Sequence, residues 1–307
     1  MPGCYVAGHF HLGGVKVMVQ QIEVEAPAKV NLRLAVVGRR PDGYHELESF
    51  MLKLALADRL TLIRQPAGIT LSCPDSSLPL GPDNLVYRAA AAFFRHTGIN
   101  GGVAITLLKR IPIAAGLGGG SSDAAATLRG LNRLFAACLT QTTLAALATP
   151  LGADVPFFVL DAPAAWAQGI GERLTPAPVP EVGWILLVNP GFPVSTKWAY
   201  ENFALTMGGN PFILGRGLVS ANSAESRGNI RMLPLFNDLE AVTIGRYPEV
   251  AALKAALIAG GADDALMSGS GPTVFGLFAD RETAERCAAS LKPRYGDKVI
   301  LTRPLGG

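Results

Sequence analysis

The 307-residue chain has few cysteines, no long apolar run and no strong excess of either charge. No uninterrupted apolar stretch reaches the roughly 18 residues that a membrane helix needs, so no membrane partner is expected, although 49% of the residues are hydrophobic. This hydrophobic content predicts buried cores, and the chain is long enough for two domains. The four cysteines are scattered without the spacing of a metal site, which favours reduced thiols and a cytoplasmic location: Cys4, Cys73, Cys138 and Cys287.

Basic residues are also too dispersed to suggest binding to nucleic acid. The chain has 27 Lys and Arg against 24 Asp and Glu, and Arg39-Arg40 is its largest basic cluster. A nucleic-acid surface needs a basic stripe, so no nucleic-acid partner is expected. The small positive balance would help to attract a polyanionic small molecule. Residues 1–21 carry no basic segment followed by an apolar core, so they read as an N-terminal extension rather than a signal peptide. Nothing in the sequence indicates an oligomeric state.

From Ile22 onward, strand and helix patterns are mixed along the chain. Alternating apolar residues predict strands at 30–36, 51–62 and 103–108. A helix is expected to begin at Asp83 or Asn84 and to stop at Gly98. Further patterns predict a strand at 184–188 and helices at 196–203, 250–259 and 282–291. This mixture indicates an α+β fold, and the prolines at 176, 178 and 180 mark a boundary between domains at 22–178 and 179–307.

The most informative segment is a glycine-rich loop that leads into a helix. It reads Pro112-Ile113-Ala114-Ala115-Gly116-Leu117-Gly118-Gly119-Gly120-Ser121-Ser122-Asp123 and is followed by alanines and leucines at helical spacing. Glycines allow positive φ angles and let a ligand approach the backbone amides. A helix N-terminus favours an anion, so the loop predicts a site for the phosphates of a nucleotide. A flexible Gly/Ser linker is the alternative, but a strand pattern and a helix pattern bound the segment.

Two common phosphate-binding loops do not match. A Walker loop places a lysine directly after its last glycine, whereas Ser121 follows Gly120 here. A Rossmann fingerprint needs an acidic residue about 20 positions beyond the glycines, and residues 136–142 contain none. The loop instead resembles the Pro-x-x-x-Gly-Leu-Gly-x-Gly-Ser-Ser motif of the GHMP kinases, which transfer the γ-phosphate of ATP to a hydroxyl group of a small metabolite.

Other motifs resemble one branch of that superfamily, the 4-diphosphocytidyl-2-C-methylerythritol kinases. The match runs from about residue 22 to the end of the chain, and its departures are the N-terminal extension and a segment rich in Gly, Asn and Ser at 207–231. The motifs lie in the order of the family: 26–32 (APAKVNL), 38–47 (GRRPDGYHEL), 151–158 (LGADVPFF), 169–172 (GIGE), 189–191 (NPG), 237–240 (NDLE) and 267–275 (MSGSGPTVF).

The resemblance implies a fold, a reaction and a set of ligands. The expected fold is an N-terminal domain like domain 2 of ribosomal protein S5 and a ferredoxin-like C-terminal domain. The reaction is the phosphorylation by ATP, with Mg²⁺, of the 2-hydroxyl in the erythritol part of a cytidine diphosphate-linked methylerythritol, in the non-mevalonate isoprenoid pathway. The residues implied in ATP binding are Pro112, Ala115, Gly116, Leu117, Gly118, Gly119, Gly120, Ser121 and Ser122.

The same resemblance assigns the reaction to Lys29 and Asp154. Transfer of a phosphoryl group needs an oriented hydroxyl, a group that accepts its proton and positive charge near the transferring phosphate. Asp154 is the candidate base, and a lysine beside it would keep it ionised. Ser122 is the candidate metal ligand, with helix capping as the alternative. Substrate contacts are expected from Asn31, Tyr44, His45, Asp154, Gly269, Ser270 and Gly271.

Each of these residues also has a simpler interpretation. Lys29 and Asn31 lie two apart on a strand and share a face, which on its own would suggest an ordinary solvated surface. Asp154 could be a turn residue before Pro156, and residues 268–271 could form a plain β-turn. Asp238 and Glu240 are expected to be structural. The competing functions are a related kinase for homoserine, mevalonate or a sugar, and a noncatalytic RNA-binding protein with this fold.

Overall fold

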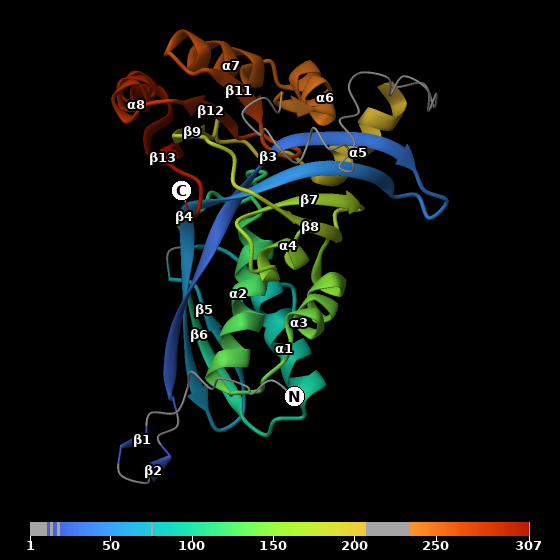
Figure 1. The fold of residues 1–307 in the computed structure, drawn as a ribbon, viewed down its shortest axis with the longest axis vertical. Helices are drawn as coiled ribbons and strands as arrows, with labels where there is room; N and C mark the ends of the chain where they lie inside the picture. The colour runs from blue at the N-terminus through green and yellow to red at the C-terminus, as the bar shows by residue number, and fades with distance from the viewer. Residues whose placement is uncertain (1–10, 13–14, 17–18, 75, 207–233, 307) are drawn as a thin grey trace. The chain divides into compact units, whose positions relative to one another are not determined.

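A computed structural model describes residues 11–12, 15–16, 19–74, 76–206 and 234–306, apart from the side chains of 11–12, 15–16 and 204–206. The predicted segment at 207–231 and most of the N-terminal extension lie outside the described residues. The chain divides into two compact units. Two long strands, β3 (Gln21–Arg39) and β4 (His45–Gln65), contribute residues to both (Figure 1).

The first unit comprises Met1–Pro27, Ala57–Ile111 and Gly119–Asp161. Within it, residues 59–65 of β4 pair antiparallel with β6 (Gly102–Leu108), which pairs parallel with β5 (Gly68–Ser72). Its helices are α1 (Leu85–Thr97), α2 (Gly119–Leu134), α3 (Gln141–Ala148) and α4 (Val155–Val159). These helices lie together beside β5 and β6 (Figure 1), with α2 packed against both α1 and α4.

Local signals in the sequence set the ends of several elements. The Asn84 side chain accepts a hydrogen bond from the amide of Val86 and caps α1, as predicted, while Gly98 ends the helix at a φ of 63°. A left-handed residue at a helix C-terminus favours glycine. The helix predicted from Ser121 begins two residues earlier, at Gly119, so part of the glycine loop is already helical.

The second unit comprises Ala28–Leu56, Pro112–Gly118 and Ala162–Gly307. Residues 47–52 of β4 pair with β7 (Ala164–Gly169), which pairs with β8 (Arg173–Ala177), while β3 pairs parallel with β10 (Phe236–Asn237). A separate antiparallel sheet has the order β11 (Asp264–Met267), β12 (Val274–Phe278), β9 (Trp184–Val188), β13 (Val299–Thr302). The helices of this unit are α5 (Thr196–Thr206), α6 (Asp238–Arg246), α7 (Glu249–Ala259) and α8 (Arg281–Tyr295).

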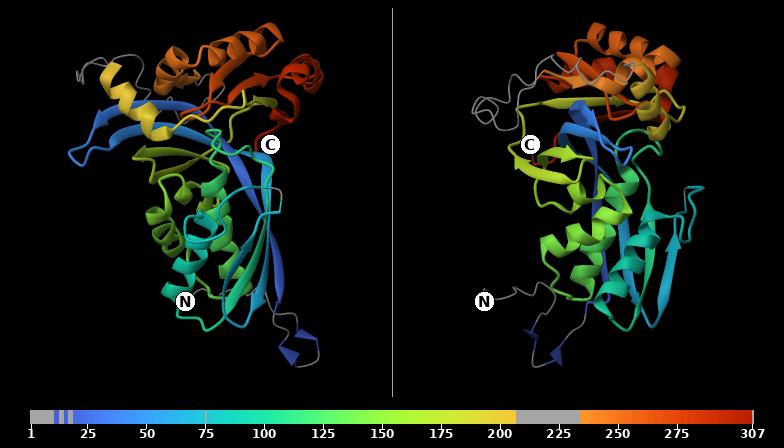
Figure 2. Two further views of the ribbon diagram at one scale, coloured as in Figure 1. Left: turned by 180° about the vertical axis from the view of Figure 1, so that it is seen from behind. Right: turned by 90° about the vertical axis from the view of Figure 1, so that its right-hand side faces the viewer.

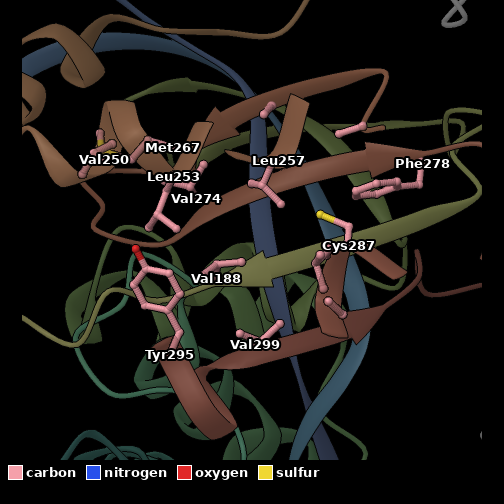
Figure 3. Close-up of a cluster of buried hydrophobic side chains, with 14 of the residues drawn as sticks. Val188, Val250, Leu253, Leu257, Met267, Val274, Phe278, Cys287, Tyr295 and Val299 are labelled. Atoms are coloured by element: carbon pink, nitrogen blue, oxygen red, sulfur yellow. The ribbon is translucent and has the colours of Figure 1, made fainter. Parts of the chain in front are cut away.

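A hydrophobic cluster joins the four-stranded sheet to the helices packed on it. Figure 3 shows Leu253 and Leu257 of α7 facing Val274 and Val188 of the sheet. Figure 2 shows α7 and α8 lying along this sheet from two further directions. The cluster extends to Leu34 and Val36 of β3, so the strand that carries the predicted catalytic lysine is anchored in this core.

The structure confirms an α+β fold, whereas the chain-order boundary near residue 178 stays a prediction. The two compact units are a different division of the chain, because residues 28–56 and 112–118 group with the C-terminal residues. The strands β3 and β4 are the physical reason, since each is long enough to contribute residues to both units of one seven-stranded sheet. Among the described helices, none is long and apolar enough to span a membrane.

Candidate functional site

The polar face of β3 is buried rather than solvated. Lys29 and Asn31 are 4% and 3% exposed. The Lys29 ammonium donates a hydrogen bond to Oδ1 of Asn31, whose Nδ2 donates to Oγ of Ser49 at 2.7 Å. Ser49 Oγ in turn donates to the backbone carbonyl oxygen of Arg33 at 2.7 Å. The predicted shared face of Lys29 and Asn31 is therefore confirmed, and the interpretation as an ordinary solvated strand is wrong.

Burying an ammonium group is expensive. Removing a charge from water costs several kcal/mol or more unless hydrogen bonds and opposite charges compensate for it. A core position needs no such group, because an apolar side chain would pack there without the cost. The burial of Lys29 among polar partners is compatible with the predicted catalytic role, which stays a prediction.

The loop between β11 and β12 approaches this lysine closely. Gly269 adopts a φ of 58°, in the left-handed region that favours glycine. A Cβ placed on Gly269 would lie 3.3 Å from the carbonyl oxygen of Gly116, 3.4 Å from Oδ1 of Asn31 and 3.5 Å from Nζ of Lys29. Four of the predicted site residues are therefore neighbours within the second unit: Lys29, Asn31, Gly116 and Gly269. The interpretation of 268–271 as a plain β-turn does not account for this closeness.

The first half of the glycine loop packs on the same strand. The amide of Lys29 donates to the carbonyl oxygen of Leu117 at 3.0 Å, and Ser268 Oγ donates to that of Gly116, also at 3.0 Å. Gly116 has a φ of 76° and Gly118 one of 69°, as expected for a loop that bends sharply. Ala115 and Leu117 are buried and anchor the loop, Pro112 and Gly118 are half-buried, and Ile113 is exposed at its tip.

The second half of the loop forms the first turn of α2 in the first unit. Ser121 is half-buried and Gly120 is exposed, whereas Ser122 and Asp123 are fully or almost fully buried. Among the hydrogen bonds of the described residues, Oγ of Ser122 and Oδ1 of Asp123 have no partner. Buried polar atoms are nearly always paired, so Ser122 and Asp123 keep acceptor capacity at the first turn of α2, and the role of Ser122 as a metal ligand stays a prediction.

A buried ionic network that the sequence analysis missed supports this turn. The Lys109 ammonium bridges Asp58 and Asp123, with 2.7 Å to the Asp123 carboxylate. Asp58 also accepts the backbone amides of Arg110 and Ile111, at 2.5 and 2.8 Å. Burial raises the pKa of Asp123 to about 7, against the attraction of the Lys109 charge. The network connects the residues just before the glycine loop, 109–111, to Asp123 just after it. The only sign of this network in the sequence was the acidic residue directly after Ser122.

Asp154 lies in the first unit, near the first turn of α2. It is half-buried at the N-cap position of α4 but makes no capping hydrogen bond to that helix. A Cβ placed on the nearby Gly152 would lie 4.0 Å from Oγ of Ser121, so the turn that carries Asp154 adjoins the predicted phosphate site. Lys29 belongs to the other unit, and its pairing with Asp154 stays a prediction.

The turn after β3 presents two aromatic residues. Gly43 has a φ of 88°, and Asp42 Oδ1 accepts the amide of Tyr44 at 3.1 Å. Tyr44 is 61% exposed, which is unusual for a large aromatic side chain. The His45 ring stacks on that of Tyr200 from α5, with centroids 5.3 Å apart and an angle of 23°. Burial, aided by the charge of Arg39, lowers the pKa of His45, so its imidazole is neutral at pH 7.

Comparisons with known proteins agree with this geometry. The model of the GHMP kinases N terminal domain matches residues 84–162, and that of the GHMP kinases C terminal domain matches residues 219–298. A 4-diphosphocytidyl-2-C-methyl-D-erythritol kinase from Moorella thermoacetica is 46% identical over 287 residues, which cover 92% of this chain and 99% of the relative. The chain belongs to this kinase family.

Other relatives and structures give the same family assignment. The 4-diphosphocytidyl-2-C-methyl-D-erythritol kinase of Geobacter sp. strain M21 is 44% identical over 91% of this chain and 97% of its own length. A crystal structure of a kinase of this family has a TM-score of 0.75 at 37% identity and covers 93% of this chain and all of its own. A homoserine kinase of Cytophaga hutchinsonii, 20% identical with a TM-score of 0.65 over 94% of this chain and 96% of its own, shares the fold.

The site residues of this family member fit a nucleotide with its metal ion. The glycines leave the backbone open to phosphate oxygens, and the unpaired Ser122 Oγ is a suitable ligand for Mg²⁺. Magnesium is usually held by one or two protein groups together with phosphate oxygens. Among the described residues, no cluster of three or more His, Cys, Asp or Glu side chains is placed to hold a metal ion.

We predict that Gly119→Val weakens ATP binding at least tenfold, about 1.4 kcal/mol, while the protein stays folded. A Cβ at Gly119 would lie 3.1 Å from Cγ2 of Ile111 and 3.3 Å from Nζ of Lys109, so the added side chain crowds both residues and occupies space beside the predicted phosphate site. Titration calorimetry measures the affinity for ATP, and a thermal melt controls for folding. Wild-type affinity in a folded Gly119→Val protein would show that this loop does not bind the phosphates.

Proposed function

We propose that the protein transfers the γ-phosphate of ATP to the 2-hydroxyl of 4-diphosphocytidyl-2-C-methyl-D-erythritol, a step of the non-mevalonate isoprenoid pathway, in the cytoplasm. The observation that carries this proposal is the buried Lys29 ammonium, held beside Asn31 and within reach of Gly269. Identity of 44–46% to kinases named for this substrate supports the choice of acceptor. Mg²⁺ is proposed as the metal ion, with Ser122 as one ligand.

ATP supplies the phosphoryl group, and a bound Mg²⁺ would neutralise part of the phosphate charge. Ser121, Ser122 and the amides at the start of α2 hold the phosphates, since the N-terminus of a helix attracts anions. Lys29 offers positive charge in a site that is already desolvated, where an ion interacts more strongly than in water. Because its hydrogen bond to Asn31 fixes the ammonium in advance, little reorganisation is needed during the reaction.

Asp154 is proposed to orient the acceptor hydroxyl and to accept its proton. The residue fits this role because the turn that carries it lies beside Ser121 at the start of α2. Tyr44 and His45 are proposed to bind the cytosine ring. An exposed tyrosine offers a flat face for stacking, and a neutral imidazole offers one hydrogen-bond donor and one acceptor. Tyr200, which stacks on His45, extends this aromatic surface.

A coupled assay of ADP release tests the acceptor. We expect ADP release with 4-diphosphocytidyl-2-C-methyl-D-erythritol and at most background release with homoserine, mevalonate or galactose. The same assay without an acceptor measures the background hydrolysis of ATP. Faster turnover with any other acceptor in this panel would favour a related GHMP kinase. Salt-sensitive retention of RNA, with no ADP release for any acceptor, would favour the noncatalytic RNA-binding alternative.

We predict that Asp154→Asn lowers kcat by about 10²–10⁴, the usual range for general-base assistance, because the shape is kept and the accepting charge is lost. Lys29→Met should also lower kcat, since it removes charge stabilisation of the transition state. The double variant should lose less than the product of the two single losses, because each residue acts through the other. Steady-state kinetics measure all three variants, with nucleotide affinity as the control. A multiplicative loss would mean that the two residues act independently.

Tyr44→Ala is expected to raise the KM for the cytidyl substrate at least tenfold and to leave the KM for ATP within about twofold, because one stacking contact is worth about 1–3 kcal/mol. The exposed side chain makes folding insensitive to this change. Tyr87→Ala on α1 serves as a matched tyrosine variant outside the aromatic surface. Equal losses for both ligands in Tyr44→Ala would indicate a general packing role.

A further inference from the structure

One face of α6 is bonded to the backbone of the loop that faces Lys29. Asn237, Glu240 and Thr243 follow one another at intervals of three residues and therefore share a face of the helix. Asn237 and Thr243 are buried. All three side chains bond to backbone groups of the segment 267–270, which lies about 30 positions further along the chain.

Asn237 makes the central contacts. Its Nδ2 donates to the carbonyl oxygens of Met267, at 2.8 Å, and of Gly269, at 2.7 Å. Its Oδ1 accepts the amide of Leu239 at 3.0 Å and caps α6. Both amide protons and the amide oxygen are thus used, which fixes the orientation of the side chain.

Glu240 and Thr243 hold the same loop on either side of these contacts. Glu240 Oε2 accepts the amide of Met267 at 2.9 Å, and Thr243 Oγ1 donates to the carbonyl oxygen of Ser270 at 3.4 Å. The other carboxylate oxygen of Glu240 is bound by the Lys254 ammonium of α7. Four hydrogen bonds therefore tie Met267, Gly269 and Ser270 to α6 and its N-cap.

The same helix is tied to the strand that carries the lysine. Asp238 Oδ2 accepts the amide of Val36 at 2.7 Å, and β10 pairs with β3 at Arg33 and Leu34. The prediction that Asp238 and Glu240 are structural is confirmed by these contacts. Because α6 bonds both to β3 and to the loop, it sets the separation between Gly269 and the side chains of Lys29 and Asn31.

We propose that Asn237 is a positioning residue for the phosphoryl transfer, an inference that rests on the function proposed above. It holds the carbonyl of Gly269, and this keeps the left-handed glycine in contact with Lys29 and Asn31. Loss of the two donated hydrogen bonds lets the loop shift toward or away from the lysine. A displacement of about 1 Å in a reacting assembly can cost about a hundredfold in rate.

The test compares substitutions that separate capping from loop attachment. Asn237→Asp keeps the capping oxygen, since aspartate is a good N-cap residue, but replaces the donor amide by an oxygen. We expect kcat to fall about tenfold to a hundredfold, with the KM for ATP within about twofold of wild type. Asp280→Asn makes the reverse exchange at the N-cap of α8, and its kcat should be unchanged.

A double-mutant cycle with Lys29→Met distinguishes positioning from partial unfolding. If Asn237 acts through the surroundings of Lys29, Asn237→Asp should lower kcat less than threefold in the Lys29→Met background. A reduced fraction of folded protein would instead lower kcat by the same factor in both backgrounds, and this result would overturn the proposal. If Asn237→Asp does not fold, Thr243→Val takes its place in the cycle, because it removes one hydroxyl donor to the loop. It should lower kcat about threefold in the wild-type background and by a smaller factor in the Lys29→Met background.

Hydrogen exchange of the ligand-free protein gives an independent measurement. Amides of residues 267–271 should exchange faster in Asn237→Asp than in wild type or Asp280→Asn, while those of β9 stay unchanged. Unchanged exchange in this loop, or a kcat within twofold of wild type, would overturn the role of Asn237. Wild-type protein that releases no ADP with the cytidyl substrate would overturn the proposed function itself, which is a different result from an active enzyme that is insensitive to Asn237→Asp.

Discussion

The burial of one ammonium group constrains most of the second unit. Lys29 can remain charged and dry only if polar atoms surround it, and the chain provides these atoms from β3, β4 and two loops. Asn31 and Ser49 continue its hydrogen bonding to the backbone. Gly269 lies close to Lys29, Asn31 and the backbone of Gly116 because it has no side chain. The positions of these residues follow from the need to keep a charge in a dry site.

The two halves of the glycine loop are held in place by different interactions. Its first half is fixed by backbone hydrogen bonds to β3 and by buried Ala115 and Leu117. Its second half relies on charge, because Lys109 is held between two carboxylates under the first turn of α2.

Much of the fold could be predicted because its signals are local. The cap at Asn84, the stop at Gly98 and the strand at 184–188 were each encoded within a few residues. Periodicity also placed Lys29 and Asn31 on one face of β3. It could not show that this face is buried, because burial depends on residues such as Ser49 and Gly269 that are distant in the sequence.

The contacts that sequence reasoning missed are long-range for the same reason. Nothing near His45 indicates that Tyr200 stacks on it, and nothing near Asp123 indicates the bridge from Lys109 to Asp58. Asp238 and Glu240 were expected to be structural, but the role of Asn237 was missed, because the carbonyl groups that it binds lie about 30 positions away. Only the folded chain brings such partners together.

The attachment of α6 to the loop has a consequence for how this site can change during evolution. All four hydrogen bonds end on backbone groups of residues 267–270, so none depends on which side chains the loop carries. Ser270 can therefore be exchanged, together with its hydrogen bond to Thr196, while the path of the main chain is kept. A helix that binds only the main chain of this loop allows the side chains of the loop to diverge without changing the position of its backbone beside Lys29 and Asn31.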